Sequence, residues 1–327
     1  MTQRSQQKRH HHDRSLPSRR GVFHALFPMK NPFTWIGLFA VACWSLCGPL
    51  NREALEKLPL LPLTALLQVF GLLAVFGWLL FRKRSLVRAL RPTRHKWVVA
   101  GLYLAYTLLC TVLIDRAADR NTVLVVLLLI NLWPVLALTF GIPFFGDKLA
   151  PVWFVPGLLL TVVGSYLVIS EGALSLAHFW QGMSNQPWIV IGGLVAACIW
   201  ALCCNLMKKW PEGGEDYTAF NLAVASLALC IPSAPGIFRL VADLNLPPVL
   251  FILAALKAAG FLFWEIGIRR GHAPTVMTSA NFIPLLTALA TAWYFNLQTG
   301  PMLPIAAVLL SLGALLSRIA ARPAPAA

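Results

Sequence analysis

The sequence predicts an all-α integral membrane protein, with ten transmembrane helices arranged as two inverted repeats of five. Three observations predict this fold. The composition is that of a chain embedded in lipid, the apolar residues gather in ten segments of spanning length, and short motifs of the first half return in the second half.

Composition separates the chain from soluble proteins. Hydrophobic residues make up 58% and charged residues 12% of its 327 residues, whereas a soluble domain carries about 25% charged residues. The mean hydropathy is +0.71. The formal charge of +15 could suit a nucleic-acid-binding protein, but the basic residues lie in the N-terminal stretch and in short loops. That distribution is typical of membrane proteins, so nucleic acid is not expected as a partner.

Ten segments meet the length of about 20 mostly apolar residues that a spanning helix needs. Pro232 and Pro235 interrupt the seventh segment, and the tenth is short. The predicted spans are Phe33–Leu50, Leu63–Phe81, Trp97–Ile114, Val123–Phe140, Val152–Ile169, Trp188–Met207, Ala219–Phe238, Val249–Ile268, Val276–Phe295 and Leu303–Leu316.

The spans divide the chain into regions. Residues 1–30 are polar and basic and cannot bury enough apolar surface to fold alone, so they are expected to be a disordered cytoplasmic tail. Residues 31–170 form the first five-helix repeat and 188–318 the second. A periplasmic connection, 171–187, joins the repeats, and 319–327 form a second cytoplasmic tail.

Basic residues predict the orientation. With the N-terminus inside, 21 of the 27 Lys and Arg residues fall on the cytoplasmic side, 5 fall outside, and Lys257 lies within the eighth span. The positive-inside rule therefore puts both termini in the cytoplasm. The expected location is the bacterial inner (plasma) membrane, which the chain crosses many times.

The halves repeat each other in short motifs. The run Asn-Leu-Trp-Pro at 131–134 returns 150 residues later as Asn-Phe-Ile-Pro at 281–284, and Cys-Trp-Ser-Leu-Cys at 43–47 returns as Ile-Trp-Ala-Leu-Cys at 199–203. An odd number of helices in each repeat inverts the second repeat relative to the first. Inverted repeats form a binding site near the membrane midplane.

Polar residues inside the spans suggest where that site lies. Lys257 sits near the middle of the eighth span, where it either anchors a substrate carboxylate or closes a gate, or else snorkels to the outer interface. Glu265 precedes Arg269 by one helical turn, a spacing that stabilises a helix end. The alternatives are that Glu265 binds the ammonium group of a substrate or carries a proton.

The two Asn-x-x-Pro runs have both a structural and a functional interpretation. Asn131 and Asn281 are polar groups that need partners inside the membrane, and Pro134 and Pro284 each remove a backbone hydrogen bond. The runs either form kinks held by an asparagine-to-backbone bond or let the fourth and ninth helices move as gates.

The seven cysteines all lie in apolar segments, where packing as small hydrophobes is expected. A soft-metal site built from Cys43, Cys47, Cys203 and Cys204 is the weaker alternative, because no histidine or acid accompanies them. The prediction is that the protein has no metal site and no cofactor.

The spans and motifs together resemble the drug/metabolite transporter (EamA) superfamily, with Trp44-Ser45 in the first helix and Trp200-Ala201 in the sixth. Within that superfamily, the similarity over 33–316 is to the YddG-type aromatic amino acid exporters. The runs that carry it are Leu132-Trp133-Pro134, Val155–Leu160 with Val163-Gly164, and Trp264 with Gly267-Ile268 and Gly271.

The resemblance implies a central cavity through which aromatic and other neutral amino acids leave the cell. The cavity would be lined by helices one, three, four, six, eight and nine. By the same resemblance, the cavity-facing aromatic residues would be Trp44, Tyr106, Trp133, Trp200 and Trp264. For the tryptophans, the alternative is packing between helices.

Enzymatic motifs are missing from the chain. It has no GxxxxGK, HExxH or GxSxG pattern and no histidine in mid-helix. We therefore expect a transporter and not an enzyme: a monomer that exports small metabolites by alternating access, with the substrate and the lipid bilayer as its partners. The alternatives are export of another metabolite or drug by proton antiport, and a non-transporting scaffold or receptor.

Overall fold

A computed structural model describes residues 31–116, 126, 129–146, 148–169, 177, 180, 184, 186–210, 216–242, 246–296 and 301–322. This part of the chain is almost entirely helical, and seven of its helices are long and apolar enough to cross a membrane. The predicted helical class is confirmed for this part of the chain, and the seven apolar helices are compatible with the predicted integral membrane protein. The predicted tail at 1–30 lies outside the described residues, as do most of the connection at 171–187 and residues 323–327.

Six of these seven helices are continuous. The remaining one, Ala273–Tyr294, has a break inside it. The continuous helices are α2 (Pro32–Lys57), α3 (Leu60–Phe81), α5 (Arg94–Arg116), α10 (Pro187–Lys209), α11 (Asp216–Ala242) and α12 (Pro248–Arg270). The broken span consists of α13 (Ala273–Ser279), the 3-10 helix η1 (Ala280–Phe282) and α14 (Ile283–Tyr294).

Shorter elements complete the described chain. Three apolar helices are α7 (Trp133–Phe145), α8 (Pro151–Ile169) and α15 (Leu303–Ala320), and a five-residue helix, α4 (Leu86–Leu90), joins α3 to α5. Two-residue strands β1 (Lys148–Leu149) and β2 (Ala321–Arg322) pair antiparallel and tie the segment before α8 to the end of α15.

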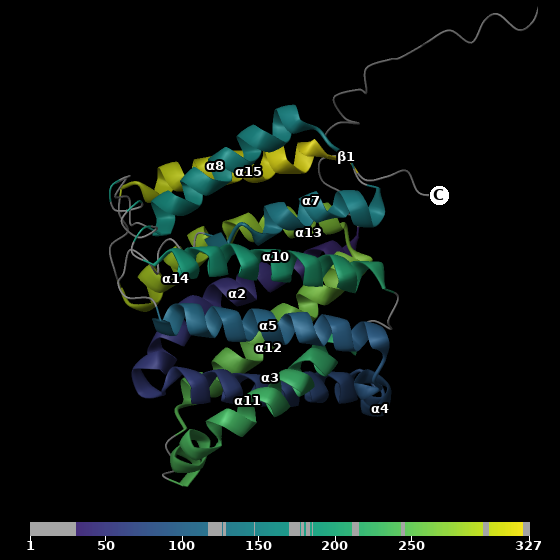
Figure 1. Cartoon of the computed structure of the whole chain (residues 1–327), viewed down its shortest axis with the longest axis vertical. Coiled ribbons are helices and arrows are strands. Elements are labelled where there is room, and N and C mark those ends of the chain that lie inside the picture. The colour runs from purple at the N-terminus through teal and green to yellow at the C-terminus, as the bar shows by residue number, and fades with distance from the viewer. Residues whose placement is uncertain are drawn as a thin grey trace, which may run out of the picture.

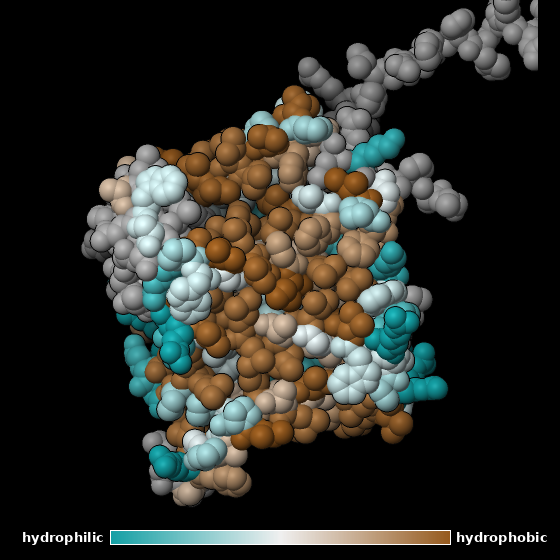
Figure 2. Space-filling view, in the orientation of Figure 1, coloured by the Kyte–Doolittle hydropathy of each residue, from teal (hydrophilic) through white to brown (hydrophobic). Residues whose placement is uncertain are grey.

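The helices lie side by side, with α8 and α15 at one edge of the bundle and α3 and α11 at the other (Figure 1). Strand β1, which pairs with β2 at the end of α15, and helix α4 share one end of the bundle. Hydrophobic side chains cover the face between the two helix ends, and hydrophilic side chains gather at both ends (Figure 2). This is the surface of a protein whose helix sides meet lipid and whose helix ends meet water.

Small residues allow the helices to pack closely. Helices α2 and α12 make the most extensive interface, in which a Cβ atom on Gly267 would lie 2.4 Å from the Cα atom of Gly37. Helices α8 and α15 meet in the same way, because a Cβ atom on Gly313 would lie 2.9 Å from the carbonyl oxygen of Gly157. Backbones that approach this closely gain van der Waals contact, which drives helix association in lipid.

Two predicted helices differ from the structure at their Asn-x-x-Pro runs. The fourth was predicted as Val123–Phe140, but a turn at Asn131-Leu132 precedes α7, which begins at Trp133 and ends at Phe145. The ninth was predicted as the continuous helix Val276–Phe295, but it is interrupted at η1. In both, proline is the second residue of a new helix, where its missing N–H costs nothing.

Helix ends also differ from their prediction, most of all in α2, which ends at Lys57, seven residues beyond the predicted end at Leu50. Helix α11 corresponds to the predicted span Ala219–Phe238. It continues to Ala242 even though Pro232 and Pro235 lie inside it. Prolines are tolerated in membrane helices because neighbouring groups can satisfy the freed carbonyls. Helix α15 runs to Ala320, four residues beyond the predicted end, because the apolar pattern says little about where a helix ends in the polar interface.

Candidate functional site

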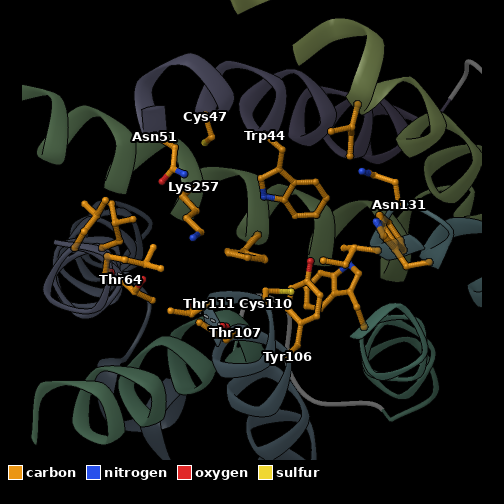
Figure 3. A pocket seen from close by; sticks show the side chains of 18 residues that line it. Trp44, Cys47, Asn51, Thr64, Tyr106, Thr107, Cys110, Thr111, Asn131 and Lys257 are labelled. Atoms are coloured by element: carbon orange, nitrogen blue, oxygen red, sulfur yellow. Dashed lines mark hydrogen bonds between the residues drawn. The ribbon is translucent and has the colours of Figure 1, made fainter. Parts of the chain in front are cut away.

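A cavity of about 290 Å³ lies between α2, α3, α5, α10 and α12, beside the turn that precedes α7 (Figure 3). Its volume is close to the lower end of the range for pockets that hold small ligands. Of the residues predicted from the sequence to bind substrate, those that line this cavity are Trp44, Tyr106, Asn131, Trp133, Trp200 and Lys257. Trp264, Glu265 and Asn281 are not among the residues that line it.

Trp200 of α10 lies at the centre of an aromatic wall. Its ring centroid is 5.1 Å from that of Tyr106, which stacks on it, and 6.3 Å and 6.2 Å from those of Trp44 and Trp133, which meet it edge to face. Such ring pairs contribute about 0.5–1.5 kcal/mol each beyond the burial of their surface. The rings hold one another in place and present a flat apolar surface to the cavity.

Trp264 supports this wall from behind. Its side chain is fully buried, with ring centroids 5.2 Å from Trp44 and 5.1 Å from Trp133. Its indole N–H donates to the sulfur of Cys204 at 3.4 Å. The structure therefore favours the packing alternative for Trp264 over the cavity-facing position that the family resemblance implied.

Lys257 extends from α12 into the cavity, with Cys47 and Asn51 of α2 beside it (Figure 3). None of the described residues forms an ion pair with its ammonium group. An ammonium inside the membrane is costly unless water or a counter-ion solvates it. The ammonium group of Lys257 therefore lies in the cavity, where a bound anion would pair with it.

Glu265 has a structural position, away from the cavity. Its carboxylate accepts hydrogen bonds from the backbone N–H groups of Tyr217 (3.2 Å) and Thr218 (2.8 Å) and from the Thr218 hydroxyl (2.7 Å). It also pairs with Arg269 at 3.0 Å. A carboxylate at the N-terminus of α11 satisfies N–H groups that have no partner within that helix. These contacts agree with the helix-stabilising alternative for Glu265, and a substrate-contacting or proton-carrying role stays a prediction.

The two Asn-x-x-Pro runs share one backbone geometry. Leu132, which precedes α7, has φ −76° and ψ −9°, and Phe282, which precedes α14, has φ −83° and ψ −9°. Asn131 faces the cavity from the first run (Figure 3). Pro134 and Pro284 start the helices that follow. Each run is therefore the junction between two helical segments, and such a junction is a position at which a helix can change direction.

The segment that leads into the second junction is anchored at its start. The backbone N–H of His272 donates to the Thr34 hydroxyl at 2.9 Å, and its ring nitrogen Nδ1 caps α13 by accepting from the backbone N–H of Thr275. Burial, with the cations Arg318 and Lys208 nearby, lowers the pKa of His272. The imidazole is therefore neutral near pH 7 and keeps this acceptor available.

Asn281 is buried, with 3% of the residue exposed. Among the residues that the structure describes, neither its amide nitrogen nor its amide oxygen has a hydrogen-bond partner. Within this part of the chain, the asparagine-to-backbone bond of the kink interpretation is not formed. An unpaired buried amide destabilises the state that contains it, and the same amide can be paired in a second arrangement of the helices.

We expect Asn281→Leu to stabilise the described state. Removing an unpaired amide should raise the free energy of unfolding by about 1–2 kcal/mol, measured as thermal stability in detergent. Asn205 is a matched control, because its side-chain amide donates to the carbonyls of Ala137 and Ala201, both at 2.9 Å. Asn205→Leu should therefore destabilise the protein. A drop in stability for Asn281→Leu would contradict the expectation.

Several residues that line the cavity were not predicted from the sequence. Phe261 contributes a ring 5.6 Å from that of Trp200, and it follows Lys257 by one helical turn. That spacing is a signal that could have identified it. The other missed lining residues include Cys47 and Cys110, together with Asn51, Thr64, Thr107 and Thr111. Short polar side chains at such spacing are common in packed membrane helices, so their pattern alone is a weak signal.

A family match accounts for this combination of apolar helices and a central aromatic cavity. Residues 33–170 match the EamA-like transporter family. The match covers most of the predicted first repeat, 31–170. The match confirms the resemblance drawn from the tryptophan motifs, and it identifies a transporter family, whose members act on small molecules within a lipid bilayer.

Two curated relatives extend the similarity to most of the chain. The aromatic amino acid exporter YddG of Salmonella typhimurium is 27% identical over 301 residues, which cover 88% of this chain and 97% of the relative. The exporter of the same name from Escherichia coli is 28% identical and covers 79% and 87%. A solved crystal structure shares the fold, with a TM-score of 0.66 and 21% identity over 88% of this chain and 98% of that one.

Proposed function

We propose that this protein exports small metabolites with aromatic or other neutral side chains, foremost amino acids, across the bacterial inner membrane. The observation that carries the proposal is the cavity itself. It combines a wall of four aromatic rings with a cation and several neutral polar groups, all at the centre of a helical bundle. Its relatives are named aromatic amino acid exporters, and a cavity with flat apolar walls suits an aromatic side chain.

The mechanism that we propose is alternating access between two inverted five-helix repeats. Helix packing supports a two-fold relation between α2–α8 and α10–α15. The first helix of each half packs on the third helix of the other, as α2 on α12 and α10 on α5. The second helices pair as α3 with α11, and the fifth as α8 with α15. A site between such halves opens to either side when one half rocks against the other.

The aromatic wall is the proposed barrier on one side of the cavity. Along α12, the residues from Lys257 through Phe261 to Trp264 lead from the cavity toward the basic end at Arg269 and Arg270. The rings of Phe261 and Trp264 both contact Trp44 of α2, at 5.4 Å and 5.2 Å. Opening toward the basic end would separate these rings, and the junctions before α7 and α14 would allow the helices to move.

The proposal also covers topology and partners. Helix α4 and strand β1 lie at the same end of the bundle, which supports the proposal that this basic end faces the cytoplasm (Figure 1). The protein would act as a monomer without catalysing a reaction, and it would bind no nucleic acid. The carboxylate of Glu265 is hydrogen-bonded to the N-terminus of α11 and paired with Arg269. Because of these contacts, we favour export down a substrate gradient over proton coupling through this carboxylate.

Proteoliposomes test the function. Purified protein is reconstituted around labelled phenylalanine, tryptophan, threonine or a purine, and efflux is measured with and without a pH gradient. We expect efflux of the aromatic amino acids above that of empty liposomes. Flux that is independent of the gradient would support facilitated diffusion, and acceleration by the gradient would support proton antiport. No flux for any compound would favour a scaffold.

Trp200→Leu should lower the rate of aromatic amino acid efflux by about tenfold or more, because it removes the ring that contacts the other members of the wall. Trp293 provides a matched control, since its side chain is 76% exposed on the outside of the bundle. Trp293→Leu should keep the wild-type rate. Equal rates for both variants would contradict the role of the aromatic wall.

A further inference from the structure

The cavity carries charge of one sign. Among the described residues that line it, Lys257 is cationic, and there is no aspartate or glutamate. The other polar side chains that line it are neutral at physiological pH, and they are Cys47, Asn51, Thr64, Tyr106, Thr107, Cys110, Thr111 and Asn131. The cavity thus offers a counter-ion to a carboxylate and none to an ammonium group.

Glu265 follows Lys257 on the same helix, but in this arrangement it is not available as a counter-ion for a substrate ammonium group. Glu265 is fully buried, and it is held by two backbone N–H groups of α11, by the Thr218 hydroxyl and by Arg269. The faces of the tryptophans offer an ammonium only the weaker attraction of a ring quadrupole. Those faces are also the surface against which the ring of a substrate would pack.

Lys257 and the aromatic wall lie at a suitable separation for one small molecule. Phe261 follows Lys257 by four residues, which is about 6 Å along a helix. Both side chains line the cavity, as do Trp44 and Tyr106. A ring joined to a carboxylate by a two- or three-atom chain spans this distance, so its carboxylate can reach the ammonium of Lys257 while its ring contacts the wall.

We propose, building on the export function above, that the cavity recognises its substrates by an aromatic ring and a carboxylate and not by an α-ammonium group. Aromatic 2-oxo acids and related aryl carboxylates are then carried as readily as aromatic amino acids. Lys257 is the residue that selects them. It is a binding residue, because its ammonium pairs directly with the substrate carboxylate.

Three compounds with the same ring separate the two charged groups of an amino acid. L-phenylalanine has both groups, phenylpyruvate has the carboxylate alone and remains ionised near neutral pH, and L-phenylalaninamide has the ammonium alone. Each is tested in two ways: by flux through proteoliposomes after subtraction of the flux in empty liposomes, and by the shift in melting temperature that its binding causes in detergent.

We expect phenylpyruvate to match phenylalanine in flux and in melting-temperature shift, and phenylalaninamide to fall about tenfold or more below both in flux. Lys257→Met should remove the response to both carboxylates and leave that to phenylalaninamide unchanged. Lys257→Arg retains the charge and should preserve the response to the carboxylates. The melting temperature of each variant without ligand shows whether it is folded.

The inference is overturned if phenylalaninamide is carried or bound as well as phenylalanine while phenylpyruvate is not, or if folded Lys257→Met keeps the wild-type response to carboxylates. Melting-temperature shifts with both carboxylates but no flux of any compound would overturn the export function and leave the recognition of carboxylates supported. The two failures are therefore distinguishable.

Discussion

Glu265→Ala is expected to lower the free energy of unfolding by about 3–5 kcal/mol, the range seen when one partner of a buried ion pair is removed. The substitution leaves Arg269, which is 11% exposed, without its carboxylate at 3.0 Å. It also leaves the backbone N–H groups of Tyr217 and Thr218 unsatisfied at the start of α11. In detergent, the variant should elute as aggregate or melt well below the wild type.

Glu53 provides a matched control for this prediction. Its carboxylate also pairs with a cation four residues away, Lys57 at 2.6 Å, and it accepts from the Tyr294 hydroxyl, but the Glu53 and Lys57 side chains are 22% and 48% exposed. An exposed pair contributes about 0–1 kcal/mol because water and salt screen it. Glu53→Ala should therefore change the melting temperature little. Similar melting temperatures for both alanine variants would contradict the capping role of Glu265.

Gly267→Val is expected to destabilise the protein by about 3 kcal/mol or more, the upper end for overpacking a rigid core. A Cβ atom at this position would lie 2.4 Å from the Cα atom and 3.0 Å from the amide nitrogen of Gly37. The obstructing atoms belong to a backbone, so no side chain can rotate away. Relief requires α2 and α12 to separate, and these helices carry Trp44 and Lys257 into the cavity.

Gly101→Val serves as the control for the glycine contact. It is also a helical glycine, on α5, and a Cβ atom there would meet no atom within 4 Å. Both variants lose a glycine from a helix, but only Gly267→Val creates a clash. The readouts are melting temperature and the fraction of monodisperse protein. A Gly267→Val protein as stable as Gly101→Val would rule out the close approach of α2 and α12.

Much of the architecture follows from local sequence. Apolar runs of spanning length identified the membrane helices to within a few residues over most of the chain. The tryptophan motifs identified four of the rings at or behind the cavity, Trp44, Trp133, Trp200 and Trp264. These features are readable because hydrophobicity and helical spacing are properties of short segments.

The polar residues inside the membrane were harder to interpret. The spacing of Glu265 and Arg269 predicted their ion pair, but nothing in the sequence pointed to the backbone of Thr218, which lies 47 residues away. Asn131 and Asn281 occupy equal places in the repeated motif, yet Asn131 lines the cavity, whereas Asn281 is buried and has no hydrogen-bond partner among the described residues. Equal motifs differ here because their neighbours come from different helices.

Sequence by itself determined that this chain is a bundle of apolar helices of spanning length, and that the short motifs around Trp44 and Asn131 return in its second half. Only the tertiary structure decided that Lys257 shares a cavity with those rings, that Glu265 caps another helix, and that α7 and α14 begin at the prolines. The physical reason is the range of the interactions. Transfer of apolar segments into lipid depends on each segment alone, whereas the partner of a buried charge depends on which helices pack together.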